Sequence, residues 1–206
     1  DLGALRIREM DEAGIDLQVI SENNPATQNL DAASAVTLAR ASNDILHEAV
    51  RAHPGRFAGF ATLPTPDPAA AADELVRAVT RLGFKGAMIM GLTHGRFMDD
   101  AQFFPVFERA AALDVPVYIH PTPPHPAVHE AYFKDYPALA GAPLGFTIEA
   151  LTHTFPLIVS GLFDKLPRLR LIVGHLGETA PFLLWRTENA LGDRISRMII
   201  DGNALP

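Results

Sequence analysis

Cysteine is absent from the 206 residues of this sequence. A disulfide framework and a thiolate metal site are therefore excluded, and any metal must be held by nitrogen and oxygen ligands. No apolar run approaches the roughly 18 residues that a membrane-spanning helix needs, so no such helix is expected. Lys and Arg number only 17, against 24 Asp and Glu. This acidic balance argues against nucleic acid or an anionic membrane as a partner, because both select for basic patches.

Two sequence motifs are missing as well. A Gly-x-Ser-x-Gly nucleophile motif does not occur, so covalent acyl transfer is not expected. A Gly-rich phosphate turn does not follow the first predicted strand, where the sequence reads Glu22-Asn-Asn-Pro-Ala-Thr27. Its absence favours a (β/α)8 TIM-type barrel over a doubly wound nucleotide-binding fold.

The ends of the sequence bear on its organisation. Asp1 falls in the middle of a predicted helix, and the final stretch from Asp201 to Pro206 brings no closing element. We therefore expect an incomplete barrel, a single partial domain over residues 1–206 of a longer protein. The N-terminal stretch has neither a charged leader nor an apolar signal region, so a cytoplasmic location is the default expectation.

Predicted strands and helices alternate along the chain, which indicates βαβ units and a parallel sheet. About five strands are expected, at residues 15–21, 57–63, 86–90, 115–120 and 169–174, with helices at 1–14, 31–53, 67–83, 100–113, 146–163 and 179–191. Asp31 and Asp67 can cap two of these helices, the second with Pro68 at its first position. The proline-rich loop at 121–143 is long for a βα connection, so we expect it to form a lid or a substrate wall.

Two histidines end apolar, β-branched runs of the kind that form buried parallel strands. His120 closes the run that begins at Val115, and His175 closes the run that begins at Leu169. Either ring alone could be a core residue that donates to a neighbouring carbonyl. Together, on successive parallel strands, they should converge on one rim, where imidazole can bind a metal or move protons. Glu178 follows closely enough to orient His175.

Other polar residues allow more than one interpretation. Glu149 and His153 share a face of a predicted helix, as a helix-surface pair or a packing contact. Arg186, beside Trp185, is either a surface arginine or a clamp for an anionic substrate. Asp201 resembles a strand-end acid and metal ligand, but a strand so soon after the last helix is not expected. The remaining histidines are expected to be solvated: His47, His53, His94, His125 and His129.

Tyr118-Ile-His-Pro-Thr122, Gly174-His-Leu-Gly-Glu178 and Leu184-Trp-Arg186 resemble the metal-dependent decarboxylase branch of the amidohydrolase superfamily. That branch includes the γ-resorcylate, 5-carboxyvanillate and aminocarboxymuconate semialdehyde decarboxylases. Further matches follow in family order: Met10-Asp-Glu-Ala-Gly-Ile-Asp16, Asn24-Pro-Ala-Thr-Gln28, Arg56-Phe-Ala-Gly-Phe-Ala-Thr-Leu-Pro64, Leu82-Gly-Phe-Lys-Gly86 and Ser160-Gly-Leu-Phe-Asp164. The resemblance spans nearly the whole chain.

The resemblance implies a distorted (β/α)8 barrel that holds one divalent metal, Zn²⁺ or Mn²⁺. His120 matches a metal-binding histidine, and His175 matches the histidine beside the metal and its acid. Glu178 matches the glutamate that hydrogen-bonds this histidine, and Arg186 an arginine near the substrate pocket. The family's Glu-x-His or His-x-His on the first strand and Ser-x-Asp on the eighth are not in this sequence, which leaves one metal ligand. Family members commonly form dimers or tetramers, so a homo-oligomer is expected.

These residues lead to one main hypothesis and two alternatives. The main one is non-oxidative decarboxylation of a small aromatic acid with an ortho hydroxyl, by metal and general acid–base catalysis. The first alternative is a related hydrolase or hydratase that acts on a lactone or an unsaturated carboxylate. The second is a truncated, non-catalytic barrel fragment that persists only by self-association.

Overall fold

The computed structural model describes residues 2–200, and the side chains of residues 2–192. Within that range the strands form two parallel sheets. One pairs β1 (Gln18–Ile20) with β2 (Phe57–Gly59). The other has the order β3 (Ala61–Thr62), β4 (Ala87–Met90), β5 (Val117–His120) and β6 (Leu171–Val173). Parallel strands joined by helices confirm the predicted α/β architecture.

One predicted strand, 57–63, proves to be two. The backbone N–H of Phe60 donates to the Ile20 carbonyl at 2.9 Å, and that of Ala61 donates to the Gly86 carbonyl at 2.8 Å. The chain therefore changes partner at this point, from β1 on one side to β4 on the other. The strands still follow one another in chain order, as in a barrel wall.

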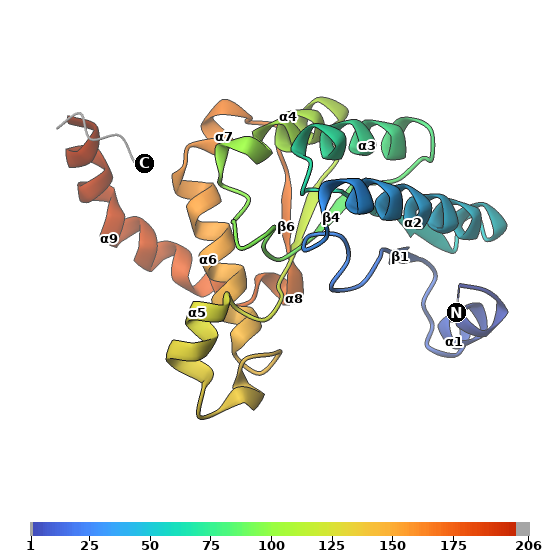
Figure 1. Ribbon diagram of the computed structural model, residues 1–206, viewed down its shortest axis with the longest axis horizontal. Coiled ribbons are helices and arrows are strands. Elements are labelled where there is room, and N and C mark those ends of the chain that lie inside the picture. The colour runs from blue at the N-terminus through green and yellow to red at the C-terminus, as the bar shows by residue number, and fades with distance from the viewer. Residues whose placement is uncertain (1, 201–206) are drawn as a thin grey trace.

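Helices account for most of the other described residues. The longer ones are α1 (Ala4–Glu12), α2 (Ala32–Ala52), α3 (Pro68–Thr80), α4 (Phe104–Leu113), α6 (Gly145–Val159) and α9 (Ala180–Ile200). The short ones are η1 (Ala101–Phe103), α5 (Pro126–Val128), η2 (His129–Phe133), η3 (Pro137–Leu139), α7 (Leu162–Lys165) and α8 (Gly174–Gly177). Figure 1 shows α9 leading away from the body of the molecule.

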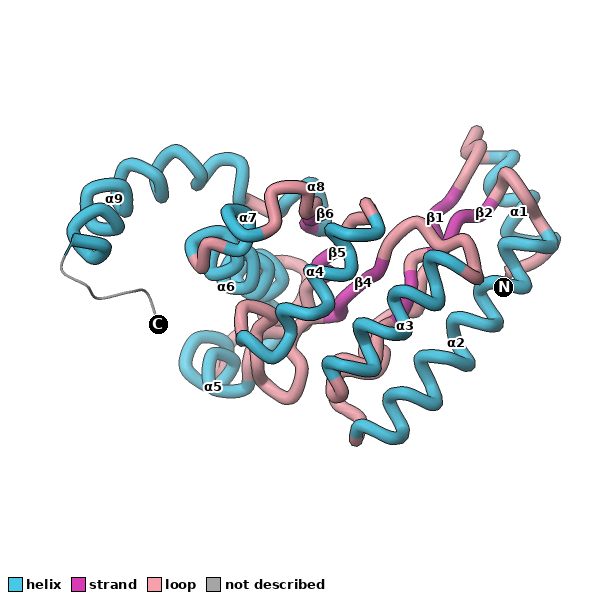
Figure 2. The backbone as a smooth tube through the Cα atoms, turned by 90° about the horizontal axis from the view of Figure 1, so that it is seen from above, coloured by secondary structure: helices cyan, strands magenta, loops and turns pink. Residues whose placement is uncertain are grey.

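Both predicted helix caps are present. The Asp31 side chain accepts from the Ser34 N–H at 3.0 Å, and Asp67 accepts from the Ala70 N–H at 3.0 Å. Each cap satisfies a backbone donor that the first helical turn leaves unpaired. Helices α2, α3 and α4 then lie along one side of the strands (Figure 2).

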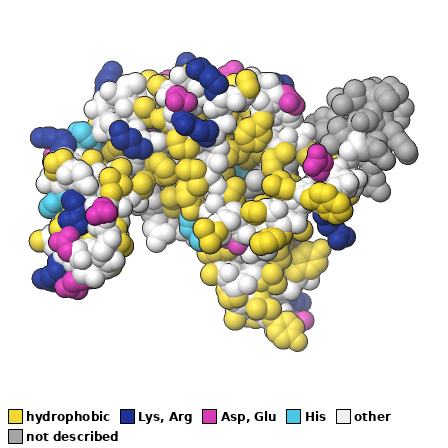
Figure 3. All heavy atoms as spheres, turned by 180° about the vertical axis from the view of Figure 1, so that it is seen from behind, with side chains coloured by type: hydrophobic (Ala, Val, Ile, Leu, Met, Phe, Trp, Pro, Cys, Tyr) yellow, Lys and Arg dark blue, Asp and Glu magenta, His cyan; other side chains and the backbone are white. Residues whose placement is uncertain are grey.

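The core lies between these helices and the sheet. Leu75 of α3, Phe107 of α4 and Ile119 of β5 are each no more than 1% exposed. The opposite side of the sheet is less covered, since Val19 is 50% and Ile172 37% exposed. Apolar side chains gather over the middle of the face shown in Figure 3.

Some predicted boundaries were wrong. The loop expected at 121–143 contains the short helical segments α5, η2 and η3. The helix expected at 146–163 is broken between α6 and α7, where Gly161 takes a φ of +76° that ends a right-handed helix. The last helix was expected at 179–191, but α9 continues to Ile200. Asp201 lies outside the described residues. No helix in the described part of the chain is both long and apolar enough to cross a membrane.

Candidate functional site

The carboxyl ends of β5 and β6 bring His120 and His175 together. The two strands pair in parallel, with Ile119 opposite Val173. The histidine rings lie edge to face, with their centroids 5.1 Å apart and their planes at 76°. The convergence predicted from two strand-end histidines is therefore present in the structure.

The hydrogen bond of His120 decides which of its ring nitrogens is available. Its Nδ1 lies 2.7 Å from the carbonyl oxygen of Pro121. A carbonyl can only accept, so Nδ1–H donates and Nε2 keeps its lone pair. Burial lowers the pKa of His120 below 6.5, as does nearby His175, while the Pro121 carbonyl and two carboxylates act in the opposite direction. A neutral imidazole with a free Nε2 is the form that binds a metal.

His175 is held by the glutamate three residues further on. Its Nδ1 lies 2.5 Å from Oε1 of Glu178, and the hydroxyl of Thr147 on α6 donates to Oε2 at 2.7 Å. The Glu178 side chain is only 9% exposed, whereas that of His175 is 46% exposed. The carboxylate therefore orients the imidazole, as expected from sequence, and Nε2 takes no part in this hydrogen bond.

An unusual backbone turn makes this pairing possible. His175, Leu176, Gly177 and Glu178 all take positive φ, of 50°, 60°, 80° and 51°. Such a conformation costs about 1–2 kcal/mol for each residue other than glycine. The Glu178 N–H lies within 3.2 Å of the carbonyl of Gly174, which closes the turn. Strain of this kind concentrates at functional sites. Of these four residues, the sequence predicted a tight turn only at Gly177.

Two aromatic rings flank the histidines, and sequence reasoning missed both. Phe146, in the first turn of α6, stacks on His175 at 6.1 Å and 10°, and lies edge-on to His120 at 6.3 Å. Tyr118 stacks on His120 at 6.4 Å and 22°. Tyr118 could have been found, because it precedes His120 by two residues and so shares its face of β5.

Glu149 and His153 are buried, at 1% and 0% exposed. The interpretation as a helix-surface pair is therefore wrong, and the packing alternative describes them better. They face inward because this side of α6 contacts the loops that follow β4 and β5. A helical pattern alone shows that two residues share a face, but which face is buried depends on the rest of the fold.

The expectation of solvated histidines holds for His94 and His125, which are exposed. The other three, His47, His53 and His129, are only partly exposed. Nδ1 of His47 lies 3.0 Å from the Leu82 carbonyl, so this ring packs between α2 and the end of α3. For these three histidines the expectation holds only in part.

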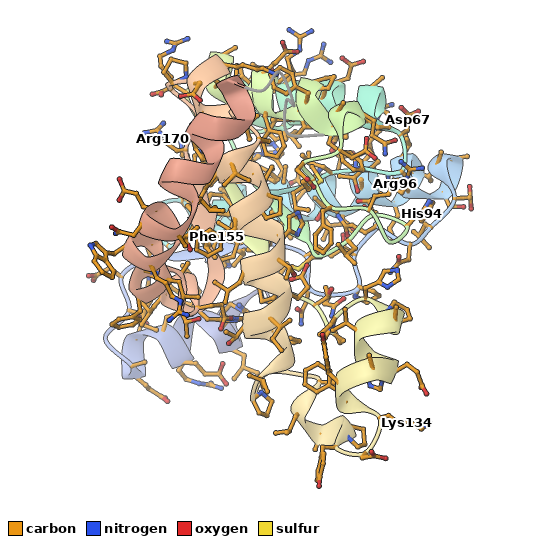
Figure 4. All side chains as sticks on the ribbon, turned by 90° about the vertical axis from the view of Figure 1, so that its left-hand side faces the viewer. Asp67, His94, Arg96, Lys134, Phe155 and Arg170 are labelled. Carbon is orange, nitrogen blue, oxygen red and sulfur yellow. The ribbon has the colours of Figure 1, made fainter. Side chains whose placement is uncertain are left out.

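A cavity of about 610 Å³ opens beside the loops after β4 and β5. Its wall includes Thr122 and His125 from the segment predicted to form a lid or wall. His94, from the loop after β4, contributes as well (Figure 4). Part of the predicted wall therefore lines this cavity, starting with Thr122, which is two residues beyond His120.

Arg186 is exposed on α9. Its exposure fits the surface alternative, and its function as an anion clamp stays a prediction. The described residues also hold no group of three or more imidazole, thiol or carboxylate side chains placed to bind a metal. Nε2 of His120 fits one nitrogen position of such a site, but the described part of the chain does not supply a complete ligand set.

Comparison with known proteins places these features in context. A family model described as Amidohydrolase matches residues 1–204. A γ-resorcylate decarboxylase from Polaromonas sp. is 42% identical over 196 residues, which cover 92% of this chain and 60% of the relative. The chain thus spans about 60% of the length of curated relatives such as this one.

Solved structures agree. A 5-carboxyvanillate decarboxylase from Sphingomonas paucimobilis superposes with a TM-score of 0.90 at 39% identity, over all of this chain and 60% of that one. A dihydroxybenzoic acid decarboxylase from Polaromonas, with bound manganese and the inhibitor 2-nitroresorcinol, superposes with a TM-score of 0.86 at 42% identity. That match covers 92% of this chain and 60% of the other.

Proposed function

Since the chain belongs to the amidohydrolase family, we propose that it carries part of the active site of a metal-dependent decarboxylase. The substrate is a small aromatic carboxylic acid with an ortho hydroxyl group. The observation that carries the proposal is the meeting of His120 and His175 at one mouth, with Glu178 bonded to the second ring. Relatives and solved neighbours named as hydroxybenzoate or vanillate decarboxylases support it.

In this proposal His120 binds the metal through Nε2, because Nδ1 is committed to the Pro121 carbonyl. Held there, a divalent ion such as Zn²⁺ or Mn²⁺ would supply Lewis-acid chemistry for a hydroxylated aromatic carboxylate. The manganese of the Polaromonas structure supports a divalent ion here. His120 supplies one ligand position, and the remainder of the set lies beyond the described residues.

His175 and Glu178 supply the proton-handling half of the site. Glu178 accepts from Nδ1–H of His175, so Nε2 can hold or pass a proton. During decarboxylation a proton reaches the ring carbon that bears the carboxylate. The bond between the ring carbon and the carboxylate carbon then breaks. Its electron pair returns to the ring, CO₂ leaves and aromaticity is restored. The resemblance assigns delivery of this proton to the aspartate of the family's Ser-x-Asp motif, which is not in this sequence, and His175 would pass the proton to that aspartate through Nε2.

Phe146 and Tyr118 support an aromatic substrate. Each ring stacks against one of the two histidines, so an aromatic side chain lies next to each of them. Flat apolar walls of this kind favour a planar ring by offset or edge contacts. They also restrict water around the carbon that must receive the proton.

Three further proposals accompany this function. Arg186 contacts the anionic substrate, for which its planar guanidinium is suited. The protein is a homo-oligomer, which the exposure of Phe182 (86%) and Trp185 (74%) on α9 supports. Residues 1–206 form one partial domain of a barrel, in the cytoplasm.

Product analysis tests the proposed function. The full-length protein, supplied with Mn²⁺ or Zn²⁺, is given γ-resorcylate or 5-carboxyvanillate carrying a ¹³C-labelled carboxylate. Release of labelled CO₂ with the decarboxylated phenol is the expected result. Addition of water to an unsaturated dicarboxylate, without CO₂, would instead identify a hydratase. For residues 1–206 expressed alone, absence of both reactions and of bound metal would favour a non-catalytic fragment.

A further inference from the structure

We propose that Glu149 and His153 form a buried positioning pair that ties the loops after β4 and β5 together and so fixes His120 in the site. The pair lies on α6, outside the set formed by His120, His175 and Glu178. The inference rests on the proposed function, because it assigns these two residues a part in the same site. Neither residue touches the substrate in this account.

The hydrogen bonds of the pair define its protonation pattern. The backbone N–H of Met98, in the loop after β4, donates to Nε2 of His153 at 3.1 Å. Nε2 must therefore be the unprotonated nitrogen, and the proton resides on Nδ1. Nδ1–H faces Oε1 of Glu149 at 3.2 Å. The other oxygen, Oε2, accepts from the backbone N–H of Thr122, in the loop after β5, at 3.3 Å.

One continuous chain of hydrogen bonds thus joins two loops through α6. It runs from Met98 through His153 and Glu149 to Thr122, which lies two residues beyond His120. The end of β5 is also held from the opposite side, where Gly91 N–H donates to the His120 carbonyl at 2.9 Å. Backbone contacts from β4 and a side-chain contact from α6 together leave His120 little freedom to move.

The surroundings argue for a function beyond stability. Glu149 and His153 are at most 1% exposed, and Phe97 packs edge-on to the His153 ring at 5.3 Å. Removing a carboxylate from water is destabilising unless hydrogen bonds compensate for the lost hydration. Apolar residues of the same volume often give equal or greater stability at such positions. A polar pair that connects two active-site loops is more readily explained by positioning.

The first test compares two buried glutamates. Glu149→Gln removes the charge and leaves one amide facing two donors, so one contact is lost. Glu74→Gln is the matched control, because Glu74 is also 1% exposed and accepts from Asn43 and Arg77, but lies in α3. We expect both variants to lose stability, and only Glu149→Gln to weaken Mn²⁺ binding and lower kcat by roughly 10- to 100-fold. Equal losses in both, or unchanged binding and kcat in Glu149→Gln, would overturn the proposal.

Two conservative substitutions at His153 test the contacts to the two loops separately. Asn places an amide N–H near Nδ1 and keeps the donor to Glu149, while Gln places an oxygen near Nε2 and keeps the acceptor for Met98. We expect amide hydrogen exchange of Met98 to speed up in His153→Asn but not in His153→Gln. Thr122 exchange should speed up most in Glu149→Gln. Exchange unchanged at both amides in all three variants would contradict the proposal.

The ¹⁵N spectrum of the unsubstituted protein provides a readout that needs neither metal nor substrate. At neutral pH His153 should show a protonated Nδ1 and an unprotonated Nε2. The opposite tautomer would remove the link to Met98 and reject the pair as described. A wild-type protein with the predicted tautomer and exchange pattern but no CO₂ release would refute the proposed function while leaving this link in place.

Discussion

The imidazole rings of His120 and His175 come from neighbouring parallel strands and meet edge to face at 5.1 Å. One ring is turned by the Pro121 carbonyl and the other by the Glu178 carboxylate, so each has its Nδ1 occupied. Both Nε2 atoms are thereby available for chemistry. The proposed division of labour between the two rings, one binding a metal and one handling a proton, rests on this geometry.

Glu178→Gln tests the carboxylate behind His175. The amide keeps the size of the side chain but loses the charge that holds Nδ1–H of His175, so we expect activity to fall by roughly 10- to 100-fold. Thr147→Val serves as the control, because it removes only the donor to the other carboxylate oxygen. Its loss should be smaller, as steady-state CO₂ release can measure. Equal activity in wild type and Glu178→Gln would remove this residue from the mechanism.

A pH titration tests the environment of His120. Burial lowers its pKa below 6.5, so we expect the ring, followed by NMR without metal, to stay neutral below that pH. The unfolded chain binds the proton first as pH falls, so this histidine's contribution to stability is present above pH 6.5 and is lost as pH drops towards the folded pKa. A midpoint at or above 6.5 would show that the ring is not buried as described.

Gly91→Ala tests how tightly β4 approaches the loop of His120. Gly91 has a φ of +62°, and a Cβ there would lie 2.1 Å from Oγ1 of Thr122. Gly83 has a similar φ of +73° with nothing within 4 Å, so Gly83→Ala isolates the backbone strain. We expect about 1–2 kcal/mol of destabilisation at Gly83, and more at Gly91 with loss of turnover. Full activity in Gly91→Ala would mean that the loop tolerates displacement.

Asp67→Ala tests the local origin of α3. The substitution leaves the Ala70 N–H without its side-chain acceptor, and we expect about 1 kcal/mol less stability to urea unfolding. Asp73→Ala, at an exposed position in the same helix, provides the control and should change stability little. If both variants lose the same amount, the cap does not explain the start of this helix.

Local patterns were enough to predict much of the fold. The strand that ends at His120, the strand that ends two residues before His175, and the helices that begin after Asp31 and Asp67 depend on residues close together in sequence. Parallel pairing then places strand ends at one rim, which explains why the two histidines could be expected to meet. The amidohydrolase resemblance stated from motifs agrees with the family match over residues 1–204.

Features that depend on distant neighbours could not be predicted in this way. The strand at 57–63 divides because residues 57–59 pair with β1 and residues 61–62 pair with β4. Burial of Glu149 and His153 depends on which face of α6 meets the loops, and Phe146 approaches both histidines only because α6 starts beside them. The left-handed turn at residues 175–178 opposes the intrinsic preference of three of its four residues.

His175→Asn in the full-length protein is the most direct test of the central claim. Asn keeps a polar group in place of the imidazole but cannot relay a proton through Nε2, so CO₂ release should fall by roughly 10²- to 10⁴-fold. Metal content, substrate binding and unfolding temperature should stay close to those of wild type, because His120 is untouched. Turnover that survives at the wild-type rate would contradict the account.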